Sequence, residues 1–181
     1  MKYLSILFLI IVVSCSEKEE ELYDFIDICQ DEFYASYGIN LEDSLLEFED
    51  KLIEHQLLRD KSFEAYQDLL FELESENKFN DYPFSIPSNS ALLVLNPKNL
   101  KECIGNRYAI DSVQLSALNY YKLQKDLSNY YASTETVGVG GVFRRYKKHI
   151  KKEDFSSIFV RKEILKLFYR WYYESEKNGD L

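Results

Sequence analysis

Glycine and proline are scarce in this chain, with 6 and 3 copies among 181 residues. Sandwiches of short β-strands need such residues in their turns, so their scarcity argues against that fold. No internal repeat of roughly 20 to 50 residues is present. Hydrophobic residues nevertheless make up 46% of the chain and aromatic residues 15%, more than a disordered chain carries. We therefore expect one folded domain with a hydrophobic core of its own.

Histidine is also scarce, because only His55 and His149 occur. Lys51 and Arg59 lie four residues before and after His55, so its helical neighbours are basic. His149 lies among six cations that would repel a metal. No serine lies in a G-x-S-x-G motif, which would mark a hydrolase nucleophile. Carboxylates are too abundant in the first half to indicate a catalytic pair, which needs a cleft. The sequence therefore predicts no metal site, no cofactor and no specific catalytic residue.

A glycine-rich stretch, VGVGG, occupies residues 137–141. A phosphate-binding loop would continue with a lysine and a hydroxyl residue, whereas Arg144 and Arg145 stand there. A dinucleotide-binding motif would need a strand before it, and none is predicted. We therefore expect these glycines to allow close packing between helices, with Gly138 and Gly141 on one face.

No apolar run reaches the roughly 20 residues that span a bilayer. The run from Leu4 to Val13 is shorter, follows a lysine, and suits the central part of a secretory signal. It ends in Val12-Val13-Ser14-Cys15, which resembles the lipobox of bacterial lipoproteins. In that family the signal is removed and the cysteine carries fatty acids such as palmitate. The resemblance implies a signal peptide over residues 1–14 and lipidation of Cys15.

Six residues after this cysteine, 16–21, are almost all charged. Ser16 differs from the aspartate that retains many lipoproteins at the inner membrane, so the resemblance implies an outer membrane. The acidic run also resembles the surface-export signal of Bacteroidetes lipoproteins. A solvated acidic tether without a receptor is the alternative. We expect residues 15–21 to form a lipidated tether, on the cell surface or on the periplasmic face.

Apolar spacing from residue 22 onward predicts an all-α fold, a single bundle of about six helices over residues 22–173. Gly38 ends the first helix and Asn40 caps the second. Asp60 or Ser62 opens the third, and the short connection before it predicts that the second and third helices form an antiparallel pair. The apolar face of the second helix consists of Leu41, Leu45, Phe48 and Leu52.

Further helices are expected in the second half of the chain. One begins at Asp111 or Ser112 and runs to about Tyr131, one ends at Ile150, and one opens at Asp154 and is buried deeply. The first of these has an apolar face of Val113, Ala117, Tyr120, Leu127 and Tyr131. Prolines interrupt residues 80–96, where ALLVL fits either a buried helical turn or a short strand. Residues 174–181 are expected to form a frayed tail.

The remaining cysteines, Cys29 and Cys103, are an even pair once Cys15 is lipidated. In an oxidising compartment an even number of cysteines favours a disulfide. Such a bridge would close a loop of about 75 residues and contribute roughly 4 kcal/mol. Two buried free thiols are the alternative.

Charge is divided unevenly along the chain. Residues 17–81 contain 21 acidic and 5 basic side chains, whereas residues 82–181 contain 10 acidic and 16 basic ones. The cationic face of one amphipathic helix would either balance the acidic half, which we favour, or bind an anionic partner such as lipid phosphate. A nucleic acid is a poor partner for an exported chain with a pI near 4.8. This basic face consists of Arg144, Arg145, Lys147, Lys148, Lys151 and Lys152.

Tyrosine is abundant, with 15 copies, several of them in doublets. Exposed tyrosines suit contacts with proteins or sugars, although ordinary packing explains most of them. Our leading interpretation is a membrane-anchored, non-catalytic binding or assembly module for a protein or glycan partner. The alternative is a small extracytoplasmic hydrolase that uses carboxylates of the acidic half. A cleft with two converging acids and perturbed pKa values would favour the enzyme.

Overall fold

The structure is a computed structural model of the chain, and it describes residues 2–75, 103–105, 108, 110, 112–133 and 138–177. Every regular element within these ranges is a helix, so the all-α prediction is confirmed. Residues 80–96 lie outside the described residues, and their conformation stays a prediction. The elements are α1 (Lys2–Ala35), α2 (Leu41–Glu54), α3 (Phe63–Ser75), α5 (Ser112–Ala117), α6 (Asn119–Ser133), α7 (Val139–His149), the 3-10 helix η3 (Asp154–Ser156) and α8 (Ile158–Lys177).

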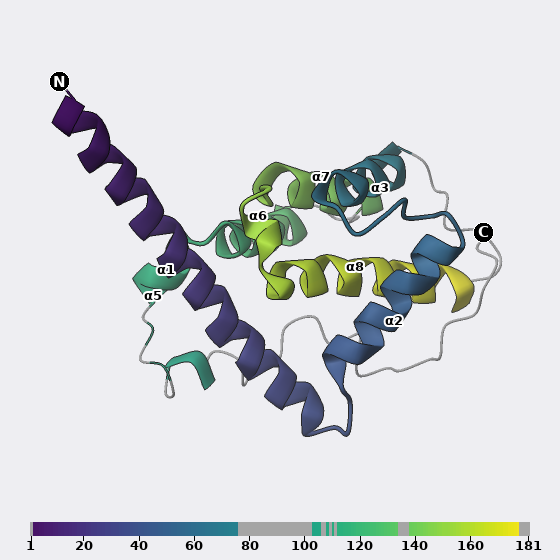
Figure 1. Cartoon of the computed structure of the whole chain (residues 1–181). Helices are drawn as coiled ribbons and strands as arrows, with labels where there is room; N and C mark the ends of the chain where they lie inside the picture. Colours follow the sequence, from purple (N-terminus) through teal and green to yellow (C-terminus); the bar gives the residue numbers. More distant parts are fainter. Residues whose placement is uncertain are drawn as a thin grey trace.

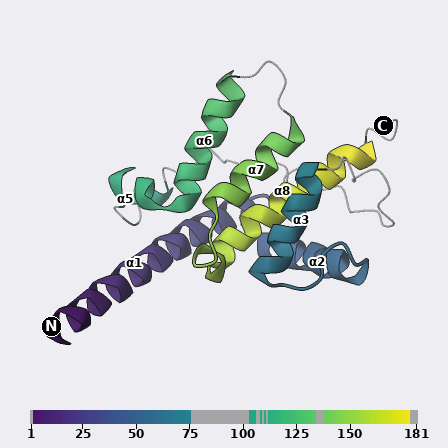
Figure 2. The ribbon, with the colours of Figure 1, turned by 90° about the horizontal axis from the view of Figure 1, so that it is seen from above.

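Helix α8 lies in the middle of the molecule, with α1 and α2 packed along it (Figure 1). Helix α7 packs between α3 and α6, on another side of α8 (Figure 2). The aromatic side chains of Phe159, Phe168 and Tyr169 on α8 are fully buried or nearly so. The expectation that the last helix is deeply buried is therefore met. The first half of α1 projects beyond the other helices in both views.

Local capping signals position α1 and α2 as expected. Gly38 has a φ of 74°, a left-handed conformation that glycine adopts without a steric penalty and that ends α1. The side chain of Asn40 accepts a hydrogen bond of 3.2 Å from the amide of Asp43 and caps α2. At the start of α3, the hydroxyl of Ser62 accepts one of 3.2 Å from the amide of Ala65. All four residues of the predicted apolar face of α2 are buried.

The predicted antiparallel pairing of α2 with α3 is wrong, because α3 packs along α7 instead. The physical reason lies at Gly140, where a Cβ would come within 2.8 Å of the backbone oxygen of Glu74. Without a side chain there, the backbone of α7 closely approaches the end of α3. The glycines thus allow close helix packing as predicted, although Gly141 lies against the ring of Tyr130 on α6. Helices α2 and α3 meet through the hydroxyl of Tyr66, which donates to Glu49.

The single helix expected over residues 112–131 is also wrong, because the chain bends at Leu118 between α5 and α6. Val113, Ala117 and Tyr131 are exposed, contrary to the predicted apolar face. Two contacts account for the bend. The side chain of Asn119 donates to Asp154 over 3.0 Å, and the amide of residue 120 donates to the hydroxyl of Tyr23 over 3.4 Å. The residues that these contacts turn toward the core are Leu115, Leu118, Tyr120, Leu123 and Leu127.

Helices α1 and α8 both extend beyond the bounds predicted for them. Helix α1 is continuous from Lys2, so the residues predicted as signal peptide and tether are helical in the whole chain, and signal removal stays a prediction. Helix α8 extends past residue 173 to Lys177, and residues 178–181 lie outside the described ranges. Within the described residues, no helix is both long enough and apolar enough to cross a membrane.

A disulfide joins Cys29 on α1 to Cys103, with the two Cα atoms 5.9 Å apart. This is the pairing that the even number of cysteines favoured. Cys29 is almost fully buried, and nearby the rings of Phe25 and Tyr108 stack with their centroids 4.3 Å apart. The bridge therefore ties the middle of the chain to the buried side of α1.

Candidate functional site

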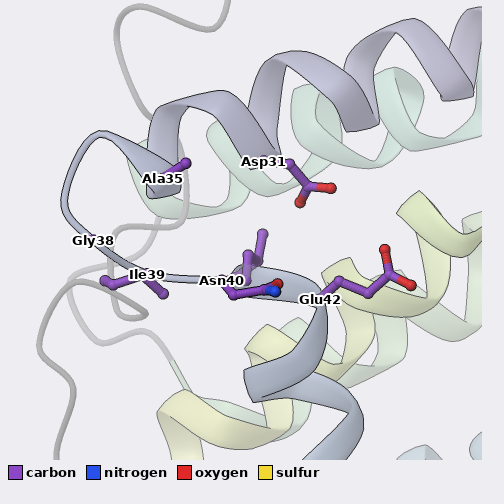
Figure 3. A pocket seen from close by; sticks show the side chains of 7 residues that line it. Asp31, Ala35, Gly38, Ile39, Asn40 and Glu42 are labelled. Carbon is purple, nitrogen blue, oxygen red and sulfur yellow. The ribbon is translucent and has the colours of Figure 1, made fainter.

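A pocket lies where the end of α1 meets the start of α2 (Figure 3). It is called the larger pocket because a second one, beside η3, is smaller. Its volume is about 330 Å³, and it is broadly open to solvent. Asp31 on α1 and Glu42 on α2 extend their carboxylates into the gap between the two helices. Its lining thus combines two acids and an amide with aliphatic walls: Asp31, Ala35, Gly38, Ile39, Asn40, Leu41 and Glu42.

The turn between α1 and α2 gives this pocket a firm wall. The amide of Ile39 donates to the carbonyl of Tyr34 over 3.1 Å, which closes the last turn of α1. The side chains of Ile39 and Leu41 are buried in the core on either side of Asn40. The amide group of Asn40 also donates to the carboxylate of Asp43. The polar residues of the pocket are therefore held on a backbone that the core anchors.

A buried lysine lies behind the pocket. The Nζ atom of Lys162 on α8 is 2.7 Å from Oδ1 of Asp31 and 2.7 Å from Oδ1 of Asp27. Lys162 has no exposed surface, so its charge is balanced by these two carboxylates. Burial raises the pKa of Asp27 to about 6, although Lys162 acts in the opposite direction. Asp31 therefore belongs both to the pocket and to a buried ion pair.

A second buried polar group lies beside this pair. The Oε1 atom of Glu163 accepts a hydrogen bond of 2.6 Å from the side chain of Gln30, and its Oε2 accepts one of 2.7 Å from Tyr120. Lys166 forms an ion pair with Glu163 and is fully buried. Burial raises the pKa of Tyr120 well above its ordinary value. These contacts connect α1, α6 and α8 through the core.

Sequence reasoning missed this buried network, although a signal for it exists. On α8 the polar residues Lys162, Glu163 and Lys166 recur at helical spacing inside an apolar arc. On α1 the polar residues Asp27, Gln30 and Asp31 recur at the same spacing. Two matching polar sets on two otherwise apolar faces indicate that the helices pair there. Neither set was predicted, because only the apolar positions of these two helices were considered.

The basic face of α7 and the segment after it contacts acidic side chains of the same chain. Glu74 on α3 pairs with Arg144 at 2.8 Å and with Lys147 at 3.0 Å. Asp126 on α6 pairs with Arg145 at 3.3 Å and with Lys148 at 2.9 Å. These contacts support the interpretation that the basic face balances acidic residues. Asp126, however, lies outside the acidic half of the chain.

The two remaining basic residues of this face also have partners. Lys152 pairs with Glu64 at 2.6 Å, and the Nζ atom of Lys151 donates to the backbone oxygen of Lys148. His149 contacts Asp126 at 2.8 Å. Hydrogen bonds from His149 and from Lys148 lower the pKa of Asp126 to about 2.

Neither metal ligation nor family membership assigns a function. Among the residues that the structure describes, no three His, Cys, Asp or Glu side chains are grouped so that they could hold a metal ion. Comparisons of the chain with family models, with curated proteins and with solved structures give no match.

Proposed function

We propose that the protein is an outer-membrane lipoprotein, held by Cys15, that acts as a non-catalytic binding or assembly module for a protein or glycan partner. The observation that carries the proposal is the disulfide between Cys29 and Cys103. Disulfides form and persist in oxidising, extracytoplasmic compartments. Because this bridge uses the other two cysteines, Cys15 is left as the single thiol available for lipid, at the end of the lipobox.

The direction of α1 supports a role in display. Cys15 and Ala35 lie on the same continuous helix. At 1.5 Å per residue, the twenty residues between them span about 30 Å. The larger pocket lies at the end of α1 that is farther from the proposed anchor. A lipid at Cys15 would therefore leave the pocket accessible to a partner away from the bilayer surface.

Pocket chemistry favours binding over catalysis. Asp31 already pairs with the buried Lys162, and Asp27, the acid with the raised pKa, does not line the pocket. A general acid must reach the bond that it protonates, which Asp27 in this position does not. Two carboxylates and the amide of Asn40 on aliphatic walls instead suit cationic side chains of a protein or hydroxyl groups of a sugar.

A hydrolase is the second candidate, because Asp31 and Glu42 approach one pocket from two helices. Two acids on one cleft are the arrangement that glycoside hydrolysis needs. We expect neither Asp31→Asn nor Glu42→Gln to change any hydrolytic activity of the purified protein on glycans. Activity that disappears in both variants while their melting temperatures stay unchanged would establish the enzyme.

Anchoring is tested by labelling cells with a fatty acid that carries a chemical handle. Wild-type protein should be labelled, and Cys15→Ser protein should not. Equal labelling of both would refute lipidation at this residue.

Capture from membranes that contain the intact lipoprotein then tests binding. Glu42→Arg reverses a charge of the pocket and should lose the partner, whereas Glu54→Arg, an exposed acid at the far end of α2, should retain it.

A further inference from the structure

A second, smaller pocket lies between α1 and η3, nearer the proposed anchor. Its volume is about 30 Å³, which exceeds the roughly 10–15 Å³ needed to hold one water molecule. It is therefore large enough for one small polar group. Four of the seven residues around it carry carboxylates and none is basic: Glu19, Glu20, Tyr23, Glu153, Asp154, Ser156 and Ser157.

Asp154 is held firmly in place by contacts within the protein. Its Oδ1 atom accepts a hydrogen bond of 2.9 Å from the hydroxyl of Tyr23. Its Oδ2 atom accepts one of 3.0 Å from Asn119 and one of 2.8 Å from the amide of Lys151. These contacts join α1, α6 and η3 around the pocket. Asp154 is therefore held in position by the protein and needs no further partner.

The other three carboxylates differ from Asp154. Within the described part of the chain, the side chains of Glu19, Glu20 and Glu153 form no ion pair or hydrogen bond. The nearby lysines are engaged elsewhere, since Lys152 pairs with Glu64 and Lys151 donates to a backbone oxygen. The lining of the pocket is thus net negative.

Ser157 is the observation that points to a ligand. Only 4% of this residue is exposed, and it lines the pocket. Its Oγ atom has no hydrogen-bond partner among the described residues. Buried polar atoms nearly always have such a partner, so a donor placed in the pocket would satisfy this hydroxyl. Because carboxylates attract positive charge, the acidic lining favours a cationic donor over a neutral one.

We propose that this pocket binds the primary ammonium group of an ethanolamine phospholipid headgroup. A primary ammonium has three donors and no acceptor, which matches a lining of carboxylates and a hydroxyl acceptor. A metal ion fits less well, because no three ligating side chains are suitably grouped in the described ranges.

The position of the pocket selects the lipid as the source of the ammonium, and this step depends on the proposed lipidation of Cys15. Glu19 and Tyr23 follow Cys15 by four and eight residues on the continuous helix α1. These separations correspond to about 6 and 12 Å along the axis. When acyl chains hold Cys15 at the bilayer, the pocket lies at the level of the headgroups.

The test compares the full chain in detergent micelles that contain either phosphatidylethanolamine or phosphatidylcholine. Choline carries three methyl groups and no N–H donor, so it neither fits the small pocket nor hydrogen bonds to Ser157. Hydrogen–deuterium exchange of the amides of residues 153–157 should be several-fold slower with the ethanolamine lipid. Equal exchange rates with the two lipids would overturn the proposal.

Variants distinguish the pocket from general attraction to an acidic surface. Glu20→Gln and Ser157→Ala should abolish the difference between the two lipids. Asp24→Asn, which removes an exposed acid of α1 outside the pocket, should preserve it. If Asp24→Asn abolishes the difference as strongly as Glu20→Gln does, the attraction is not that of the pocket and the proposal fails.

Two further measurements separate this proposal from the proposed anchoring. The Cys15→Ser chain in ethanolamine-lipid micelles should keep the slower exchange, because the micelle supplies the headgroup without lipidation. Methylammonium chloride should also slow exchange at residues 153–157, competitively with the lipid. Protection by methylammonium without any effect of the ethanolamine lipid would overturn the lipid assignment and indicate a lysine side chain of a protein partner.

Discussion

The Nζ atom of Lys162 lies 2.7 Å from the Oδ1 atom of Asp27, and the lysine has no exposed surface. The pair therefore joins α8 to α1 inside the core. Buried ion pairs of this kind often contribute little net stability, but removing one charge leaves the other uncompensated. Asp31 shares the lysine and also lines the larger pocket, so the pocket and the core are electrostatically coupled.

The raised pKa of Asp27 predicts an unusual dependence of stability on pH. Its pKa in the folded protein is about 6 and its ordinary value is 3.8, so the folded state binds this proton more tightly than the unfolded chain does. The free energy of unfolding should therefore fall as pH rises from about 4 to about 6, by about 3 kcal/mol at most. Asp27→Asn should remove this slope.

Urea denaturation at several pH values above 4 measures this effect. The range avoids the opposite contribution of Asp126, whose pKa of about 2 makes stability fall only in stronger acid. Asp24→Asn on the exposed side of α1 is the matched control and should keep the slope. An Asp27→Asn protein with the wild-type slope would show that another group titrates.

Loss of the disulfide should destabilise the protein strongly. The bridge joins residues 74 positions apart, and closing a loop of this length contributes roughly 4 kcal/mol. The double variant Cys29→Ser/Cys103→Ser should therefore melt at a much lower temperature than wild type. Cys15→Ser is the control and should melt like wild type. A melting temperature unaffected by reducing agent would contradict the stabilising role of the bridge.

Gly140→Ala should weaken the packing of α7 on α3. The new Cβ would lie 2.8 Å from the backbone oxygen of Glu74, and neither helix backbone can move easily to avoid it. Overpacking of this kind typically costs about 1–3 kcal/mol, which outweighs the better helix propensity of alanine. Gly105→Ala is the control, since no atom of the described residues lies within 4 Å of its Cβ. Thermal melts of the two variants should differ clearly.

Charge reversal on the basic face separates its two interpretations. The double variant Arg144→Glu/Lys148→Glu places like charges beside Glu74 and Asp126. Because exposed ion pairs contribute about 0–1 kcal/mol each, we expect a modest loss of stability and unchanged binding to anionic vesicles. Lys151→Glu, which removes a donor to a backbone oxygen and breaks no ion pair among the described residues, should have a smaller effect. Wild-type stability combined with lost vesicle binding would favour an anionic partner.

Local signals predicted the elements that depend on neighbouring residues. The helix end at Gly38, the cap at Asn40 and the apolar face with Leu45 and Phe48 were predicted correctly. A left-handed turn, a cap and helical spacing each depend on residues only a few positions apart. The disulfide partner of Cys29 followed from simple counting. The all-α class likewise follows from periodicity and from the scarcity of turn residues.

Long-range contacts account for what the sequence did not reveal. The partner of α3 depends on Gly140, and the bend at Leu118 depends on contacts with Asp154 and Tyr23 from other helices. The larger pocket was not foreseen, because its acids resemble the many others of the first half. Lys162 was missed because burial of its charge requires carboxylates from α1, more than a hundred residues away.

Helix α1 also determines how mechanical force would pass through the protein. If a partner in the larger pocket pulls against a lipid at Cys15, the load enters α1 at Cys15 and near the turn at Gly38. An axial pull on a helix stretches its successive turns in series. The disulfide at Cys29 and the ion pairs of Asp27 and Asp31 with Lys162 would pass part of this load to the rest of the domain. The protein would transmit force as a short rod with the folded domain attached to its side.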